Sequence, residues 1–292
     1  MPATDGARAE QAERSAPAAI MAAAALAARH CRDCGWYHGF WPVVRALGCG
    51  TEPDDHASFY ARALAGAAAS GPIGRVLISG SADDAMPALI LRLAADLGRH
   101  PTITVLDRCA TPLALCRATL AAGDGMLDTV EGDALDAALE GGFDLIATHS
   151  FLGYFDEAGR AALLARWRSL LRPGGRVLTV NRIRSDGPDI VTFTEAQIEA
   201  FVARLCERHS HRRDLSALPP TEIATRARVY ATRFTIRPVR SVAAIGRMAQ
   251  DAGLEIEARP LGTPGRAAAG TPSGPTAPGG ASYVGFVLRR PG

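Results

Sequence analysis

The chain has 292 residues, 48% of them hydrophobic, and a formal net charge of only +2. It contains no lysine, so the positive side-chain charges counted here are all those of arginine. A chain of this length can bury a sizeable core, and the near balance of charge gives no overall attraction to nucleic acid. No apolar run is long enough to cross a bilayer, and six cysteines do not suggest a disulfide scaffold. We therefore predict a cytoplasmic protein with no membrane or nucleic-acid partner.

The N-terminal quarter of the chain does not have the pattern of a sheet. Residues 1–16 mix charges, alanine and proline without periodicity, which predicts a disordered tail. Residues 17–70 are predicted to form several helices, one of them over 58–69 with Asp54 or Asp55 as its cap. Because this segment precedes the sheet, we expect it to fold as a lid that contributes to substrate binding.

Residues 71–184 alternate short apolar runs with amphipathic segments, which is the pattern of parallel strands joined by right-handed helical crossovers. The strands are predicted at 75–79, 102–106, 127–131, 143–148 and 176–182, and the helices at 85–97, 112–121 and 157–171.

The alternation stops at 185–240, which we predict to be a helical cap inserted after the fifth strand, and it resumes over 241–292. The fold class is therefore α/β, with a doubly wound, seven-stranded, mostly parallel sheet, an antiparallel last strand and a helical N-terminal lid. The remaining elements are predicted to be helices 194–209, 220–234 and 242–253, strands 254–260 and 282–289, and a flexible loop 262–281.

Candidate ligand-binding residues follow the first three predicted strands. Gly80 breaks the first strand into small residues, which let the backbone approach a ligand, and the next helix offers unpaired N–H groups there. Asp107 ends the second strand, and Gly132-Asp133-Ala134 follows the third. Leu171-Arg-Pro-Gly-Gly175 precedes the fifth. In open α/β sheets such strand ends form one edge, so we expect these residues to surround one ligand.

This ordered set resembles the class I S-adenosylmethionine-dependent methyltransferases, from about residue 71 to 184 and again from 241 onwards. The resemblance implies that the chain binds S-adenosylmethionine, transfers its methyl group to a small-molecule acceptor and releases S-adenosylhomocysteine. It places the cofactor against Gly80, Ser81, Ala82, Asp107, Arg108, Asp133, Ala134 and His149.

Within that resemblance, Asp107 would accept the ribose hydroxyls, Asp133 the adenine amino group, and the Ala134 N–H would donate to a ring nitrogen. The turn departs from the family pattern, because Asp83 and Asp84 stand where further glycines are usual. These acids could hold the positive charge of the cofactor, or they could only cap the following helix.

His149 follows the fourth predicted strand, where a general base for a hydroxyl acceptor would stand, so oxygen is slightly favoured over nitrogen as the acceptor atom. The alternative is that His149 only packs beside the cofactor. Arg228 and Tyr230 share a face only if their segment is extended, whereas Tyr37, Trp41 and Arg45 share one on a helix. The predicted substrate residues are Tyr37, His38, Trp41, Tyr154, Arg228 and Tyr230.

Cys31 and Cys34 are predicted to be free cysteines on a helix, with no metal, because zinc needs four ligands and no second cysteine pair with suitable spacing follows. Two other functions stay open beside methyl transfer. The chain could bind the cofactor without using it, as a sensor or partner subunit, or it could be a nicotinamide-dependent dehydrogenase, although no Gly-x-Gly-x-x-Gly is present. Association into a homodimer is also left open.

Overall fold

A computed structural model describes residues 20–120, 127–261 and 282–292 of the chain. The predicted tail 1–16 and the predicted loop 262–281 lie outside the described residues. In the described part, no helix is both long and apolar enough to cross a membrane.

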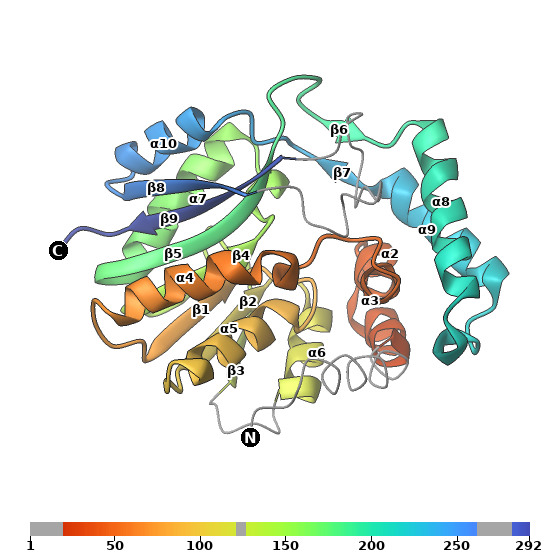
Figure 1. The fold of residues 1–292 in the computed structure, drawn as a ribbon, viewed down its shortest axis with the longest axis horizontal. Helices are drawn as coiled ribbons and strands as arrows, with labels where there is room; N and C mark the ends of the chain where they lie inside the picture. The colour runs from red at the N-terminus through yellow and green to blue at the C-terminus, as the bar shows by residue number, and fades with distance from the viewer. Residues whose placement is uncertain (1–19, 121–126, 262–281) are drawn as a thin grey trace.

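The centre of the molecule is one sheet whose strand order is β3-β2-β1-β4-β5-β9-β8 (Figure 1). The first five strands pair in parallel, and β9 pairs antiparallel with both β5 and β8. This confirms the predicted seven-stranded, mostly parallel sheet with an antiparallel last strand. In chain order the strands are β1 (Arg75–Ser79), β2 (Thr102–Asp107), β3 (Leu127–Glu131), β4 (Phe143–His149), β5 (Leu171–Ile183), β8 (Glu255–Leu261) and β9 (Ser282–Arg289).

Helices cover both faces of this sheet. One apolar core joins α4 and α5 to one face around Phe59, Tyr60 and Ile90, and another joins α7 and α10 to the other face around Trp167 and Phe286. The helices that flank the sheet are α4 (Ala57–Ala68), α5 (Ala85–Asp96), α6 (Ala110–Leu120), α7 (Glu157–Leu170) and α10 (Val242–Asp251).

The lid and the cap pack together beside the carboxyl ends of the strands (Figure 1). A third apolar core joins them, with Tyr230 at its centre, stacked between the rings of Tyr37 and Phe201 at centroid distances of 5.8 and 5.7 Å. Their elements are a helix over 20–30, α2 (Gly35–His38), α3 (Trp41–Ala46), α8 (Glu195–Ser210) and α9 (Pro220–Arg233), with the short 3-10 turns η1 (Pro53–His56) and η3 (Arg213–Leu215). A further 3-10 turn, η2 (Leu152–Tyr154), follows β4.

Local details differ from the sequence analysis. Asp54 and Asp55 do not cap α4, since Asp55 closes a reciprocal cap with Glu52 around η1, and His56 precedes α4. The single helix on which Tyr37, Trp41 and Arg45 would share a face is not formed, because α2 and α3 are separate helices. The cap also contains an unpredicted two-stranded sheet, β6 (Val191–Thr192) with β7 (Thr235–Ile236). Each strand has only two residues, which is too short to show an alternation of apolar and polar residues in the sequence.

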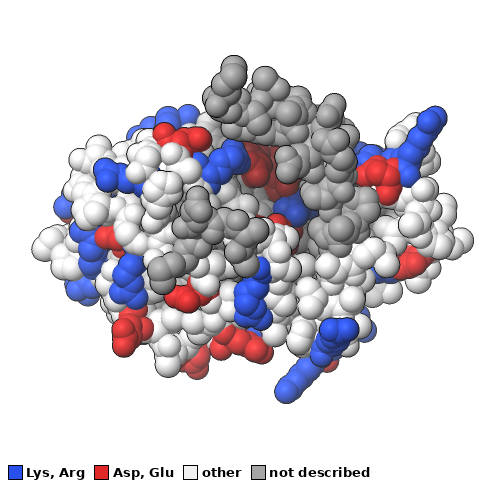
Figure 2. All heavy atoms as spheres, turned by 90° about the horizontal axis from the view of Figure 1, so that it is seen from below, with Lys and Arg blue, Asp and Glu red and all other residues white. Residues whose placement is uncertain are grey.

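Charges are mixed over the face of the molecule shown in Figure 2. On the described part of the face in Figure 2, arginine and acidic side chains are interspersed rather than gathered by sign. The described part of this face therefore shows no continuous basic track of the kind that phosphate backbones require.

Candidate functional site

A cavity of about 430 Å³ opens at the carboxyl ends of β1, β2 and β4, under the lid. This volume is in the range typical of small-molecule and cofactor sites. Most of the predicted site residues line it together: Tyr37, His38, Trp41, Gly80, Ser81, Ala82, Asp107, Arg108, Asp133, Ala134, His149 and Tyr154.

Two predicted substrate residues lie elsewhere. Arg228 is on the outside of α9 and forms ion pairs with Glu195 and Glu199, at 3.2 and 2.6 Å. Tyr230 is fully buried and lines a smaller cavity of about 80 Å³ next to the first, on the far side of Tyr37. Because α9 is helical, Arg228 and Tyr230 point in different directions, which resolves the alternative that the sequence left open.

Asp107 is held as a hydrogen-bond acceptor at the cavity floor. Its two carboxylate oxygens accept the N–H groups of Ser81 and Cys109, at 3.0 and 2.9 Å. Burial raises the pKa of Asp107, while these two N–H groups oppose that rise. Each carboxylate oxygen has two lone-pair positions, so the side chain can still accept hydroxyl donors from a ligand.

Gly80 is required by the local fold. Its φ of 77° lies in the left-handed region, and a Cβ there would collide with the ring of Phe151. The backbone can therefore approach the cavity only with glycine at this position. Phe151 and Phe155 also line the cavity. Both follow His149 shortly after the end of the fourth predicted strand, and that position in the sequence could have identified them as candidate site residues.

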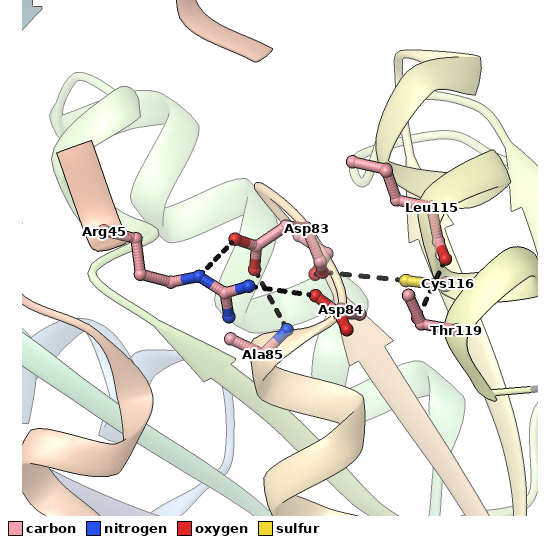
Figure 3. A network of polar contacts seen from close by, with 8 residues as sticks. Arg45, Asp83, Asp84, Ala85, Leu115, Cys116 and Thr119 are labelled. Carbon is pink, nitrogen blue, oxygen red and sulfur yellow. Dashed lines mark hydrogen bonds and ion pairs between the residues drawn. The ribbon is translucent and has the colours of Figure 1, made fainter. Parts of the chain in front are cut away.

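The acidic turn after Gly80 is neutralised from the lid (Figure 3). Arg45 of α3 forms ion pairs with Asp83 at 3.1 Å and with Asp84 at 3.3 Å, and a second carboxylate oxygen of Asp83 accepts the Ala85 N–H at 2.9 Å. Asp83 thus serves the start of α5, and it also lines the cavity. Burial raises the pKa of Asp83, and the Arg45 charge opposes this shift.

Arg45→Leu is expected to lower the free energy of unfolding by about 3 kcal/mol, because it leaves two acids without their counter-charge at a buried turn. Urea unfolding at pH 7 measures this. The control is Arg92→Leu, which removes the exposed pair with Asp54 and should cost less than about 1 kcal/mol. Equal effects of the two substitutions would show that the Arg45 pair behaves as a surface pair.

His149 is fixed by a buried phenol. Tyr60 donates to the Thr148 carbonyl at 2.8 Å and lies 3.1 Å from His149 Nδ1. Because the single phenol proton goes to the carbonyl, Tyr60 can only accept from Nδ1–H, which leaves a lone pair on Nε2. Among the described residues, His149 Nε2 has no hydrogen-bond partner. The ring therefore carries a buried, unprotonated nitrogen, and His149 is one of the residues that line the cavity.

A second buried imidazole lies beside it. The His56 ring is 5.3 Å from that of His149, and among the described residues neither of its nitrogens has a hydrogen-bond partner. Burial lowers the pKa of His56 to about 4, and burial together with the His56 charge lowers the pKa of His149 to about 3. Both rings are neutral at physiological pH.

Folding stability is expected to fall in acid between the ordinary histidine pKa of 6.5 and these lowered values, because the unfolded chain then binds more protons. From pH 7 to pH 5, each of the two histidines should remove about 2 kcal/mol of unfolding free energy. Denaturant titrations across this range measure the slope. In His149→Gln, the free energy of unfolding should fall less steeply with decreasing pH, because only His56 then contributes. An unchanged pH dependence would contradict the lowered pKa of His149.

Four side chains of the metal-ligating kind meet at the edge of the cavity. They are Cys31, Cys34, His38 and Cys109, whose ligand atoms all lie within 4.8 Å of one another. The prediction that Cys31 and Cys34 stand on a helix was wrong, because they lie in the turn between the first described helix and α2. The search for a second cysteine pair missed Cys109 because it stands alone, two residues beyond the end of β2.

Ser150, which sequence reasoning did not single out, lines both cavities and has a φ of 55°. A non-glycine residue in the left-handed region is uncommon and often stands at a functional site. Trp36, Met86 and Phe234 also line the larger cavity without having been predicted. Phe234 comes from the end of α9, and no sequence signal connects that position with the strand ends.

Comparison with known proteins agrees with this geometry. Residues 87–175 match the family model of a methyltransferase domain. No curated protein matches the sequence.

Several solved structures are similar. The S-adenosylmethionine-dependent methyltransferase SibL in its apo form is 17% identical, with 88% of this chain and 58% of that chain covered and a TM-score of 0.47. A candidate sarcosine dimethylglycine methyltransferase from Galdieria sulphuraria is 12% identical, with 81% and 85% covered and a TM-score of 0.50. The N-methyltransferase NodS from Bradyrhizobium japonicum, with S-adenosylhomocysteine bound, is 12% identical, with 95% and 100% covered and a TM-score of 0.48.

The chain thus spans 58% of the length of SibL, and at these identities the similarity shows the fold. The matched methyltransferase domain, the strand order and the ordered residues at the strand ends agree with one another. Residues 87–175 are therefore similar to a methyltransferase domain, and the described chain has a fold similar to that of known methyltransferases.

Proposed function

We propose that this protein transfers the methyl group of S-adenosylmethionine to a small-molecule acceptor, with oxygen favoured over nitrogen. The observation that carries the proposal is His149, which lines the cavity with Gly80, Asp107 and Asp133 and whose buried Nε2 has no hydrogen-bond partner among the described residues. A neutral imidazole nitrogen with a free lone pair can accept the proton that a hydroxyl acceptor loses on methylation.

In this proposal the strand ends hold the cofactor and the lid holds the acceptor. Asp107 would take the ribose hydroxyls, and Asp133 and Ala134 the adenine. The cofactor supplies a methyl group that positive sulfur has already activated, so the chain mainly has to align the acceptor and remove its proton.

The acceptor would enter between the two cavities, which share the walls Tyr37, Trp41, Ser150 and Tyr154. The rings of Tyr37 and Trp41 are stacked, with centroids 5.8 Å apart, and they provide a flat apolar surface. Three arginines line the smaller cavity, namely Arg182, Arg184 and Arg237. These features support an acceptor with an apolar or aromatic body and an anionic group.

The test is to incubate the full chain with S-adenosylmethionine labelled in the methyl group and with matched acceptors. The set pairs aromatic hydroxy acids with the corresponding amino acids and with neutral phenols, and mass spectrometry identifies the product. We expect label in the hydroxy acids first. Label confined to amines would contradict the oxygen preference, and tight S-adenosylhomocysteine binding without any methylated product would favour a protein that binds the cofactor without using it.

A further inference from the structure

We propose that Cys31, Cys34, His38 and Cys109 bind one Zn²⁺ ion, which fastens the lid to the carboxyl end of β2. Three thiolates and one imidazole are a common ligand set of structural zinc sites, and four protein ligands complete its tetrahedral coordination. Such a closed site leaves no position for a substrate, so the ion would act on the structure and not in the reaction. The inference does not depend on methyl transfer.

The spacing of the ligand atoms fits a tetrahedron around zinc. With Zn–S and Zn–N distances of about 2.3 and 2.0–2.1 Å, the edges of a regular tetrahedron are about 3.8 Å between two sulfurs and about 3.6 Å between sulfur and nitrogen. Cys109 Sγ lies 3.4 Å from Cys31 Sγ and 3.6 Å from Cys34 Sγ. Cys31 Sγ lies 3.6 Å from His38 Nδ1. The distances in these three pairs of ligand atoms therefore need to change by only a few tenths of an ångström, and the other pairs lie within 4.8 Å.

The surroundings also suit a zinc thiolate site. The Thr111 N–H donates to Cys109 Sγ at 3.5 Å, and the Thr111 hydroxyl lies 3.1 Å from Cys31 Sγ. Hydrogen bonds to ligand atoms orient them and stabilise their charge. Cys109 and His38 are buried, at 7% and 8% exposed, whereas Cys31 and Cys34 are half-buried, which leaves a path by which an ion can enter.

The site lies where it can control the cofactor cavity. The Cys109 N–H donates to Asp107, which lies on the cavity floor, and His38 follows Tyr37 in the cavity wall. An ion bound to both segments would hold the aromatic lid over the strand ends. Removal of zinc should therefore weaken S-adenosylhomocysteine binding, because the lid must then be ordered during binding.

The competing use of the same residues is a disulfide. An S–S bond is about 2.05 Å long, so any pair among the three thiols would have to close by more than an ångström, and one thiol would remain. Formation of a disulfide removes two hydrogens from the chain, and the oxidised chain would contain no bound metal. Mass and metal content therefore separate the two outcomes.

The experiment uses the full chain, purified under reducing conditions, stripped with a chelator and titrated with Co²⁺ as a spectroscopic probe and then with Zn²⁺. We expect one ion per chain, with the thiolate-to-cobalt and d–d absorption of a tetrahedral site, and displacement of Co²⁺ by Zn²⁺. Cys109→Ser should weaken Co²⁺ binding at least about 100-fold. Loss of a residue that only hydrogen-bonds to a metal ligand typically costs about 10–100-fold in affinity, and loss of a direct ligand should cost at least as much. Cys206→Ser, a half-buried cysteine outside the cluster, is the matched control and should bind normally.

His38 provides a second readout that does not depend on Cys109. His38→Ala should lose the tetrahedral spectrum, while His38→Cys should keep one ion per chain with a spectrum of four thiolates. Three results would overturn the proposal: no Co²⁺ or Zn²⁺ binding by the reduced, folded wild type, an octahedral spectrum, or full binding in both Cys109→Ser and His38→Ala.

Discussion

Asp107→Ala is expected to weaken S-adenosylhomocysteine binding about 100- to 1,000-fold, measured by calorimetric titration of the full chain. Hydrogen bonds to a charged acceptor contribute about 1.5–3 kcal/mol each, and this carboxylate is placed to accept two ribose hydroxyls. The substitution also removes the acceptor for the Ser81 and Cys109 N–H groups, so the turn that faces the cofactor loses its anchor. Both effects act in the same direction.

Asp107→Asn should be nearly as damaging, although it preserves the shape of the side chain. Each carboxylate oxygen accepts a backbone N–H, so an amide –NH₂ at either position would face another donor. The matched control is Asp128→Ala, on the neighbouring strand β3, where the aspartate is exposed. If Asp107→Ala bound S-adenosylhomocysteine as the wild type does, the cofactor would have to lie elsewhere.

The central sheet could be predicted from the sequence because most of its parallel strands are short apolar runs that end abruptly; β3, Leu-Asp-Thr-Val-Glu, is the exception among them. Gly80, Asp107 and Asp133 are far apart in the chain, but each follows a strand end, and the parallel pairing of β1, β2 and β3 brings those ends together. The predicted helix and strand limits in the described residues agree to within two residues, except that β5 begins at Leu171 and includes the stretch Leu171 to Gly175 predicted to precede it. The local pattern and the tertiary fold favour the same structure here.

The parts of the site that could not be predicted depend on contacts between segments without a shared pattern. Arg45 reaches Asp83 and Asp84 from another element, and Cys109 meets Cys31 across 78 residues. The break between α2 and α3 falls where Gly39 and Phe40 pack against Arg226 of α9. No periodicity in the sequence indicates these contacts. A count of metal ligands within the Cys31–Cys34 stretch therefore could not include Cys109.

The buried phenol–imidazole pair was also beyond sequence reasoning, and it changes what His149 is expected to do. From its ordinary pKa of 6.5, a catalytic histidine would lose activity below about pH 6. Burial and the neighbouring His56 lower the pKa of His149 to about 3, so the ring stays neutral through the physiological range. The base form is therefore always available, although it holds a proton weakly and must pass it on quickly.

His149→Ala is accordingly expected to lower kcat about 100- to 10,000-fold for a hydroxyl acceptor, the range typical of a general base, with S-adenosylhomocysteine affinity unchanged within about threefold. The pH profile of kcat/KM for the wild type should show no histidine limb between pH 5 and pH 8, because the active form is deprotonated throughout. Methyl transfer assays over this range, on the wild type and the variant, measure both.

Tyr60→Phe distinguishes proton transfer from packing. It keeps the ring but removes the acceptor for Nδ1–H, so Nε2 no longer has to carry the lone pair. If His149 is the base, Tyr60→Phe should lower kcat about tenfold or more with KM for the cofactor unchanged. If His149 only packs beside the cofactor, His149→Ala should instead raise KM and leave kcat close to that of the wild type, because packing in that case contributes equally to the ground state and the transition state.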